Sequence, residues 1–292
     1  MATNTATALN ILHLTQQYSL YFSTGVLILG IIGNAINILV FTSFRAFRNN
    51  QCALYLIVEA LANLFQLAIY FFITLSIIVY GRDPANLSLF WCKLRVLLVV
   101  ISTLVAFCSI CFCTIDQYLS TSHRYFFRQL STIKLAYILL AIAFVFALLQ
   151  SILFAVFSDI QGSVCTVFNP SMAAYISSFY YPVLSGLLPV MITSMFSLLA
   201  YRNVRQIVRR QVPIVRRRLD QQLTAMVLAR AIMFTIFSTP YTIHSIYTFN
   251  SKITVADLLR YAINNVTSAI LFIIFDLNFA VGYTKYFFGV SV

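Results

Sequence analysis

Charged residues are scarce in this chain of 292 residues. Asp, Glu, Lys and Arg together make up only 9% of it, whereas hydrophobic residues make up 61%. A water-soluble domain has about 25% charged residues, so the composition excludes an ordinary soluble enzyme. It also excludes a disordered chain, because such chains are poor in apolar residues and rich in charge.

The motifs of catalytic and cofactor sites are missing as well. The eight glycines form no phosphate-binding loop, and His13, His123 and His244 lie far apart. No group of His, Cys, Asp and Glu has metal-ligand spacing, and no Ser/His/Asp or Cys/His pairing follows from the spacing. We therefore expect no enzyme, no metal and no cofactor. The sequence also lacks the internal repeat that is typical of inverted-topology transporters.

The chain has long apolar stretches instead. A helix needs about 20 apolar residues to cross a bilayer, and the stretches lack the alternation of membrane-barrel strands. They occupy residues 20–44, 53–80, 89–119, 133–157, 175–201, 223–249 and 255–283. The expected fold is an all-α membrane protein, a bundle of seven transmembrane helices over residues 19–284. A disordered N-terminal tail (1–18) and a short C-terminal tail (285–292) are expected to flank it.

The net charge of +12 indicates how the bundle is oriented. With the N-terminus outside and the C-terminus inside, fourteen Lys and Arg lie on the cytoplasmic side and five outside, which agrees with the positive-inside rule. Seven of them lie between Arg202 and Arg218, so the basic charge marks one cytoplasmic loop and no nucleic-acid surface. This loop either only sets the topology and contacts anionic lipid, or docks a cytosolic partner.

Two of the six cysteines are expected to form a disulfide. The orientation places only Cys92, at the start of the third span, and Cys165, in the loop after the fourth, on the oxidising side. A bridge between them would hold that loop over the bundle; the alternative is two free thiols. Cys108, Cys111 and Cys113 lie inside the third span, where we expect them to pack between helices.

Polar side chains within the apolar spans are functional candidates, because they are costly in lipid. We expect them to face the bundle interior and to bond to one another or to water. The network either only fixes the helix register or rearranges when the bundle changes state. Its predicted members are Asn34, Glu59, Asn63, Asp116, Arg230, Asp276 and Asn278.

Pro189 and Pro240 lie near the middle of spans five and six. Proline removes a backbone hydrogen bond and kinks a helix. Each kink is either a pivot or a fixed bend.

Motifs along nearly the whole chain resemble the rhodopsin-like G protein-coupled receptors, in the style of divergent invertebrate peptide receptors. Cys92 and Asp116 are 24 residues apart, which matches the spacing between the family's bridge cysteine and its Asp-Arg-Tyr acid. The other matching motifs are Gly33-Asn34, Leu61-Ala62-Asn63, Trp91-Cys92, Asp116-Gln117-Tyr118, Phe234 to Pro240, and Asn278-Phe279.

The resemblance implies a cytoplasmic face that contacts a heterotrimeric G protein. Gln117, however, stands where the family has the arginine that contacts it, Asn63 replaces a sodium-binding Asp, and Phe279 replaces a proline. These changes put sodium regulation and efficient G-protein activation in doubt. The residues of the implied face are Asp116, Gln117, Tyr118, Arg209, Arg210, Arg216, Arg217, Arg218 and Asp220.

Arg230 offers a replacement for the missing arginine. It lies ten residues before Pro240, or about 15 Å along a helix, at a depth similar to that of Glu59. We hypothesise that it pairs with Glu59 or Asp116; the alternative is that it extends to the headgroups.

The resemblance places a ligand pocket on the outer side, between spans three, five, six and seven. Val99 stands where amine receptors carry an Asp, so a peptide or an apolar small molecule is favoured over a biogenic amine. The alternative for each pocket position is that its side chain only packs against neighbouring helices. The matching positions are Val99, Val100, Thr103, Tyr241, Thr242, Ser245, Ser268 and Phe272.

The resemblance implies a plasma-membrane receptor that transmits the binding of a ligand by movement of span six. One alternative is a seven-helix protein that signals without G proteins or only scaffolds partners. The other is a channel or transporter.

Overall fold

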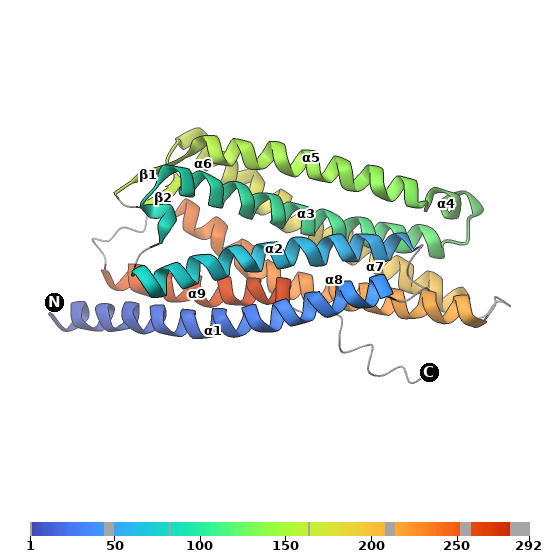
Figure 1. The fold of residues 1–292 in the computed structure, drawn as a ribbon, viewed down its shortest axis with the longest axis horizontal. Coiled ribbons are helices and arrows are strands. Elements are labelled where there is room, and N and C mark those ends of the chain that lie inside the picture. Colours follow the sequence, from blue (N-terminus) through green and yellow to red (C-terminus); the bar gives the residue numbers. More distant parts are fainter. Residues whose placement is uncertain are drawn as a thin grey trace.

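A computed structural model describes residues 2–43, 50–81, 83–162, 164–207, 214–251 and 258–280. Within these ranges, seven helical segments are long and apolar enough to cross a membrane, and they lie alongside one another as a bundle (Figure 1). The spanning segments are α1 (Ala2–Ser43), α2 (Gln51–Tyr80), α3 (Leu89–Thr121), α5 (Ile133–Phe157), the segment from α6 (Pro170–Tyr175) to α7 (Leu188–Ile207), α8 (Ile214–Asn250) and α9 (Leu258–Ala280).

Short elements connect the spans at the two ends. A 3-10 turn (Pro84–Asn86) precedes α3, and the hairpin of β1 (Ser158–Gln161) and β2 (Val164–Val167) follows α5. In the hairpin, Ser158 pairs with Val167 and Gln161 with Val164. Helix α1 begins at the same end as this hairpin, while α4 (Tyr125–Leu130) lies at the other end (Figure 1).

The first helix differs from the expectation. Residues 2–18, expected to be a disordered tail, are helical and continuous with the span. They contain neither glycine nor proline, so nothing interrupts the i to i−4 bonds that extend the helix. Forty-two residues give a rod of about 63 Å, which is longer than the hydrocarbon core of about 30 Å. By contrast, the second, third, fourth and sixth apolar segments agree with the predicted spans to within three residues.

The fifth span is irregular before the predicted kink. Residues Ile176–Leu187 form a π-helix that contains Pro182, and Pro189 is only the second residue of the following α7. Proline donates no backbone hydrogen bond, so two prolines seven residues apart favour a locally altered bonding pattern. Pro240, in contrast, lies inside α8, which stays helical from Ile214 to Asn250.

Helix α3 is central to the packing. It contacts α2, α5 and α7, and one buried aromatic cluster joins it to α8 and α9. The ring centroids of Phe107 and Phe234 are 4.9 Å apart, and those of Phe275 and Phe279 are 5.2 Å apart. Large apolar side chains such as Leu29, Ile142 and Val156 remain exposed on the outside of the bundle, as is expected where a helix faces lipid.

Helices α1, α2 and α9 approach closely at Gly30. A Cβ atom there would lie 2.5 Å from the side chain of Leu67 and 3.1 Å from the Cα atom of Ala280. The Leu67 side chain can rotate away, but the backbone of α9 cannot move without separating the helices.

We predict that Gly30→Ala lowers the free energy of unfolding by about 1–3 kcal/mol, measured by thermal unfolding in detergent. The matched control is Gly25→Ala on the same helix, where a Cβ atom meets nothing within 4 Å. This control should instead gain roughly 1 kcal/mol of helix propensity. Equal melting temperatures for the two variants would contradict the close approach.

Candidate functional site

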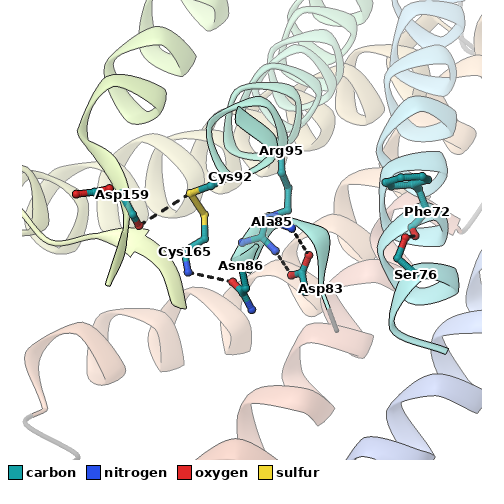
Figure 2. Close-up of polar contacts among 9 residues, drawn as sticks. All are labelled: Phe72, Ser76, Asp83, Ala85, Asn86, Cys92, Arg95, Asp159 and Cys165. Atoms are coloured by element: carbon teal, nitrogen blue, oxygen red, sulfur yellow. Dashed lines mark hydrogen bonds and ion pairs between the residues drawn. A yellow bond between two sulfur atoms is a disulfide. The ribbon is translucent and has the colours of Figure 1, made fainter. Parts of the chain in front are cut away.

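A disulfide holds the hairpin against the bundle. Cys92 of α3 and Cys165 of β2 are joined, with Cα atoms 5.7 Å apart, as the sequence predicts. The Cys165 amide also donates to Asn86 Oδ1 at 3.0 Å, and Arg95 forms an ion pair with Asp83 (Figure 2). We call this end of the molecule the disulfide end.

A second cysteine pair was not predicted. Cys52 of α2 and Cys113 of α3 are joined at the buried junction of these helices, with Cα atoms 4.9 Å apart. Cys113 is therefore more than the packing side chain that the sequence predicts. The sequence gives no signal for this pair, because the pairing depends on how α2 packs on α3. Cys108 and Cys111 remain free thiols.

A cavity of about 480 Å³ opens inside the bundle near the disulfide end. Helices α1, α2, α3, α8 and α9, the π-helix and strand β2 contribute to its wall. Most predicted pocket positions lie on this wall or on that of an adjoining pocket of about 580 Å³. Val99, Val100 and Thr103 line the first pocket, Ser245 and Ser268 line the second, and Tyr241 and Phe272 line both.

Thr242 is the exception among the predicted pocket residues. It lies on neither wall, because its methyl group faces Gly186, where a Cβ atom would come within 2.6 Å of it. Its hydroxyl donates to the carbonyl oxygen of Ser238 at 2.9 Å. Thr242 therefore packs α8 against the π-helix.

Several cavity residues were missed by sequence reasoning. Tyr70 and Tyr181 contribute aromatic surface that was not predicted. Asp276, predicted as a member of the polar network, places a carboxylate on the cavity wall. The Tyr70 and Phe272 rings meet edge to face at 5.2 Å. The sequence contains a signal that Asp276 lies on the cavity wall, since it follows the predicted pocket residue Phe272 by four residues and so shares its helix face.

Arg230 is the centre of the buried polar network. Its Nε donates to Glu59 Oε1 at 2.7 Å, and its Nη1 donates to Asn278 Oδ1 at 2.6 Å. The Arg230 and Glu59 side chains are each only 4% exposed. The structure thus pairs Arg230 with Glu59, one of the two acids considered, and ties α8 to α2 and α9.

Two amides extend the network to α1. Asn34 Nδ2 donates to the carbonyl oxygen of Phe279 at 2.7 Å, and Asn63 Nδ2 donates to Asn34 Oδ1 at 3.3 Å. Both amides are buried. Helices α1, α2 and α9 are therefore bonded to one another at this level.

The residues at the end of α3 face different partners. Asp116 Oδ1 accepts from the Ser131 hydroxyl at 2.7 Å, whereas Arg230 forms its ion pair with Glu59. Gln117 is 2% exposed, and its Nε2 donates to the Thr224 hydroxyl of α8 at 2.7 Å. The Tyr118 ring packs 5.5 Å from that of Phe196.

The predicted basic loop is only partly described. Arg209 and Arg210 lie outside the described residues, whereas Arg216, Arg217, Arg218 and Asp220 lie on the first two turns of α8. Among the residues that the structure describes, no three His, Cys, Asp or Glu side chains come together as metal ligands.

Comparison with known protein families identifies a relationship over most of the chain. The family model described as "7 transmembrane receptor (rhodopsin family)" matches residues 33–275, a range that includes α2, α3, α5, α7 and α8. No curated protein matches the chain.

We predict that Arg230→Met destabilises the protein by about 3–5 kcal/mol, because it leaves the Glu59 carboxylate buried without its cation. The double variant Arg230→Met/Glu59→Leu should recover most of the loss, since both charges are then absent. The control is Arg202→Met, at an exposed position of α7, which should change stability by less than about 0.5 kcal/mol. Thermal unfolding of the purified proteins measures all three; a double variant no more stable than Arg230→Met would refute the pairing.

We predict that Cys165→Ala lowers stability by about 2–4 kcal/mol, because the hairpin loses its covalent attachment to α3. Cys108→Ala is the matched control, since Cys108 is a free thiol. Unfolding should be compared without reductant. A Cys165→Ala melting temperature equal to that of the control would contradict the stabilising role of the bridge.

Proposed function

Because the chain belongs to the rhodopsin family of seven-transmembrane receptors, we propose that it transmits the binding of an extracellular ligand to a heterotrimeric G protein across the plasma membrane. Members of this family are multi-pass membrane receptors rather than enzymes. One observation carries the proposal: a cavity near the disulfide end is separated from the other end by a buried polar network. With the N-terminus outside, the cavity faces the extracellular side.

The cavity fits a ligand of moderate size. Its volume of about 480 Å³ lies within the range of roughly 300–1,000 Å³ that is usual for small-molecule sites. Val99, Val100 and Phe272 give it apolar walls, and Tyr181 and Tyr241 add aromatic ones. These walls are consistent with a peptide side chain or a small molecule with apolar groups.

The transmission step involves α8. Tyr241 reaches the cavity, Pro240 precedes it, and Arg230 connects the same helix to α2 and α9. A ligand that binds more tightly when α8 has tilted at Pro240 shifts the population toward that state. The Arg230 contacts then rearrange, and the cytoplasmic end of the bundle opens.

The proposed G-protein face lies at the end away from the disulfide. Asp116, Gln117 and Tyr118 close α3 there, and the basic segment Arg202–Arg218 joins α7 to α8. In the structure Gln117 is buried and bonded to Thr224. Access for a G protein therefore requires α3 and α8 to separate.

A second candidate function is a seven-helix protein that does not activate G proteins. The specific observation in its favour is Gln117, an uncharged side chain where the family has an arginine, engaged with Thr224. Such a protein would sequester a ligand or scaffold partners.

Expression in cells that report several G-protein classes, with a peptide library as the probe, tests the proposal. Ligand-dependent GTP exchange supports the receptor. Silence in every class, with normal surface expression, favours the second candidate.

We predict that Thr224→Val raises ligand-independent GTP exchange several-fold, because valine cannot accept the hydrogen bond from Gln117. A lost buried hydrogen bond of about 1 kcal/mol corresponds to roughly a fivefold shift between states. Thr239→Val is the control, since this exposed hydroxyl bonds only within its own helix. An unchanged basal rate in Thr224→Val would contradict the proposed α3–α8 contact.

A further inference from the structure

Asp276 is the unexplained charge of the cavity. Its side chain is 4% exposed and lies on the cavity wall. Its Oδ1 is buried and has no hydrogen-bond partner among the described residues. A carboxylate in this position is costly unless a cation or donors compensate it.

Tyr70 and Arg95, which share the cavity wall with Asp276, have other partners. Gln66 Nε2 donates to the Tyr70 hydroxyl at 2.8 Å, and the Ser102 hydroxyl donates to Gln66 Oε1. Arg95, the only Lys or Arg among the described residues of the cavity wall, forms an ion pair with Asp83 at the disulfide end. The folded chain therefore leaves Asp276 without a counter-charge from these groups.

Asp276 lies at the deep end of the cavity. Helix α9 begins at the disulfide end, and Asp276 is the last of its residues on the wall, after Phe272 and Phe275. On α3 the wall extends from Arg95 to Thr103, which is about 12 Å of helix. A ligand that fills the cavity thus extends from the Arg95–Asp83 pair toward the carboxylate.

We propose that the cavity binds a ligand with an ammonium or guanidinium group, which pairs with Asp276. The aromatic rings of Tyr70, Tyr241 and Phe272 on the same wall add cation–π attraction to the charge pair. This inference rests on the proposed function only in assigning the cavity to a ligand; it names the chemistry of that ligand.

The inference changes the interpretation of Val99. Val99 leaves α3 without the acid that amine receptors carry there, which by itself disfavours an amine ligand. The structure supplies an acid to the same cavity from α9 instead. The cationic group can come from a small organic amine or from a lysine, arginine or N-terminal amine of a peptide.

The test measures the thermal unfolding of purified full-length protein with paired probes. 2-Phenylethylamine and the neutral 2-phenylethanol differ only in the charged group. Short peptide amides with free N-termini, compared with their acetylated forms, represent the peptide source. We expect the cationic probe of a pair to raise the melting temperature more than its neutral counterpart, and the pair that responds identifies the source.

Asp276→Asn removes the charge and keeps the shape. It should weaken binding of the cationic probe roughly tenfold to a hundredfold, leave the neutral probe unaffected, and unfold at or above the wild-type temperature without ligand. Asp276→Glu should retain part of the preference for the cation. Asp159→Asn is the charge-matched control, because this exposed residue of β1 lies outside the cavity.

Equal responses of wild-type protein and Asp276→Asn to the cationic probes would overturn the inference, and so would the absence of any cation preference. Asp276-dependent binding without GTP exchange in any G-protein class would uphold it and count against the proposed function. GTP exchange driven by a neutral ligand, with no dependence on Asp276, would support the proposed function and overturn the inference.

Discussion

The ion pair between Arg230 and Glu59 constrains the arrangement of this bundle more than any other contact. Within a bilayer, apolar surfaces gain little by leaving lipid for one another, so packing and polar contacts decide how helices associate. A guanidinium at this depth requires a partner, and the structure supplies Glu59 and Asn278 from two different helices. The rotation of α8 about its axis is thereby set relative to both α2 and α9.

That rotation determines what α8 presents at other levels. One turn beyond Arg230, Phe234 meets Phe107 of α3 in the aromatic cluster. Farther toward the disulfide end, Tyr241 stacks on Phe275 with ring centroids 4.3 Å apart. In the other direction, Thr224 meets Gln117. A change in the Arg230 contacts would therefore affect both the cavity and the opposite end of the bundle, because one continuous helix carries all of these side chains.

The sequence predicts well how deep a residue lies in the membrane. It predicts poorly which side of its helix faces a given neighbour. Apolar length was sufficient to locate the second, third, fourth and sixth spans to within three residues, and the topology was sufficient to pair Cys92 with Cys165. The distance from Pro240 placed Arg230 at the level of Glu59, but the choice between Glu59 and Asp116 required the angle of each helix. The same limit explains Thr242, which faces the π-helix rather than the cavity, because a change of winding in one span alters which residues of its neighbour it covers. Cys52 and Cys113 could not be paired without the packing of α2 on α3.

The hairpin of β1 and β2, which lines the cavity, is attached to the rest of the bundle at several points. The bridge to α3, the Asn86 contact and the strand pairing together resist a swinging movement. The part of the cavity wall that the hairpin forms should therefore stay nearly fixed in position. Movement of this hairpin should therefore not be a slow step that limits the association rate of a ligand.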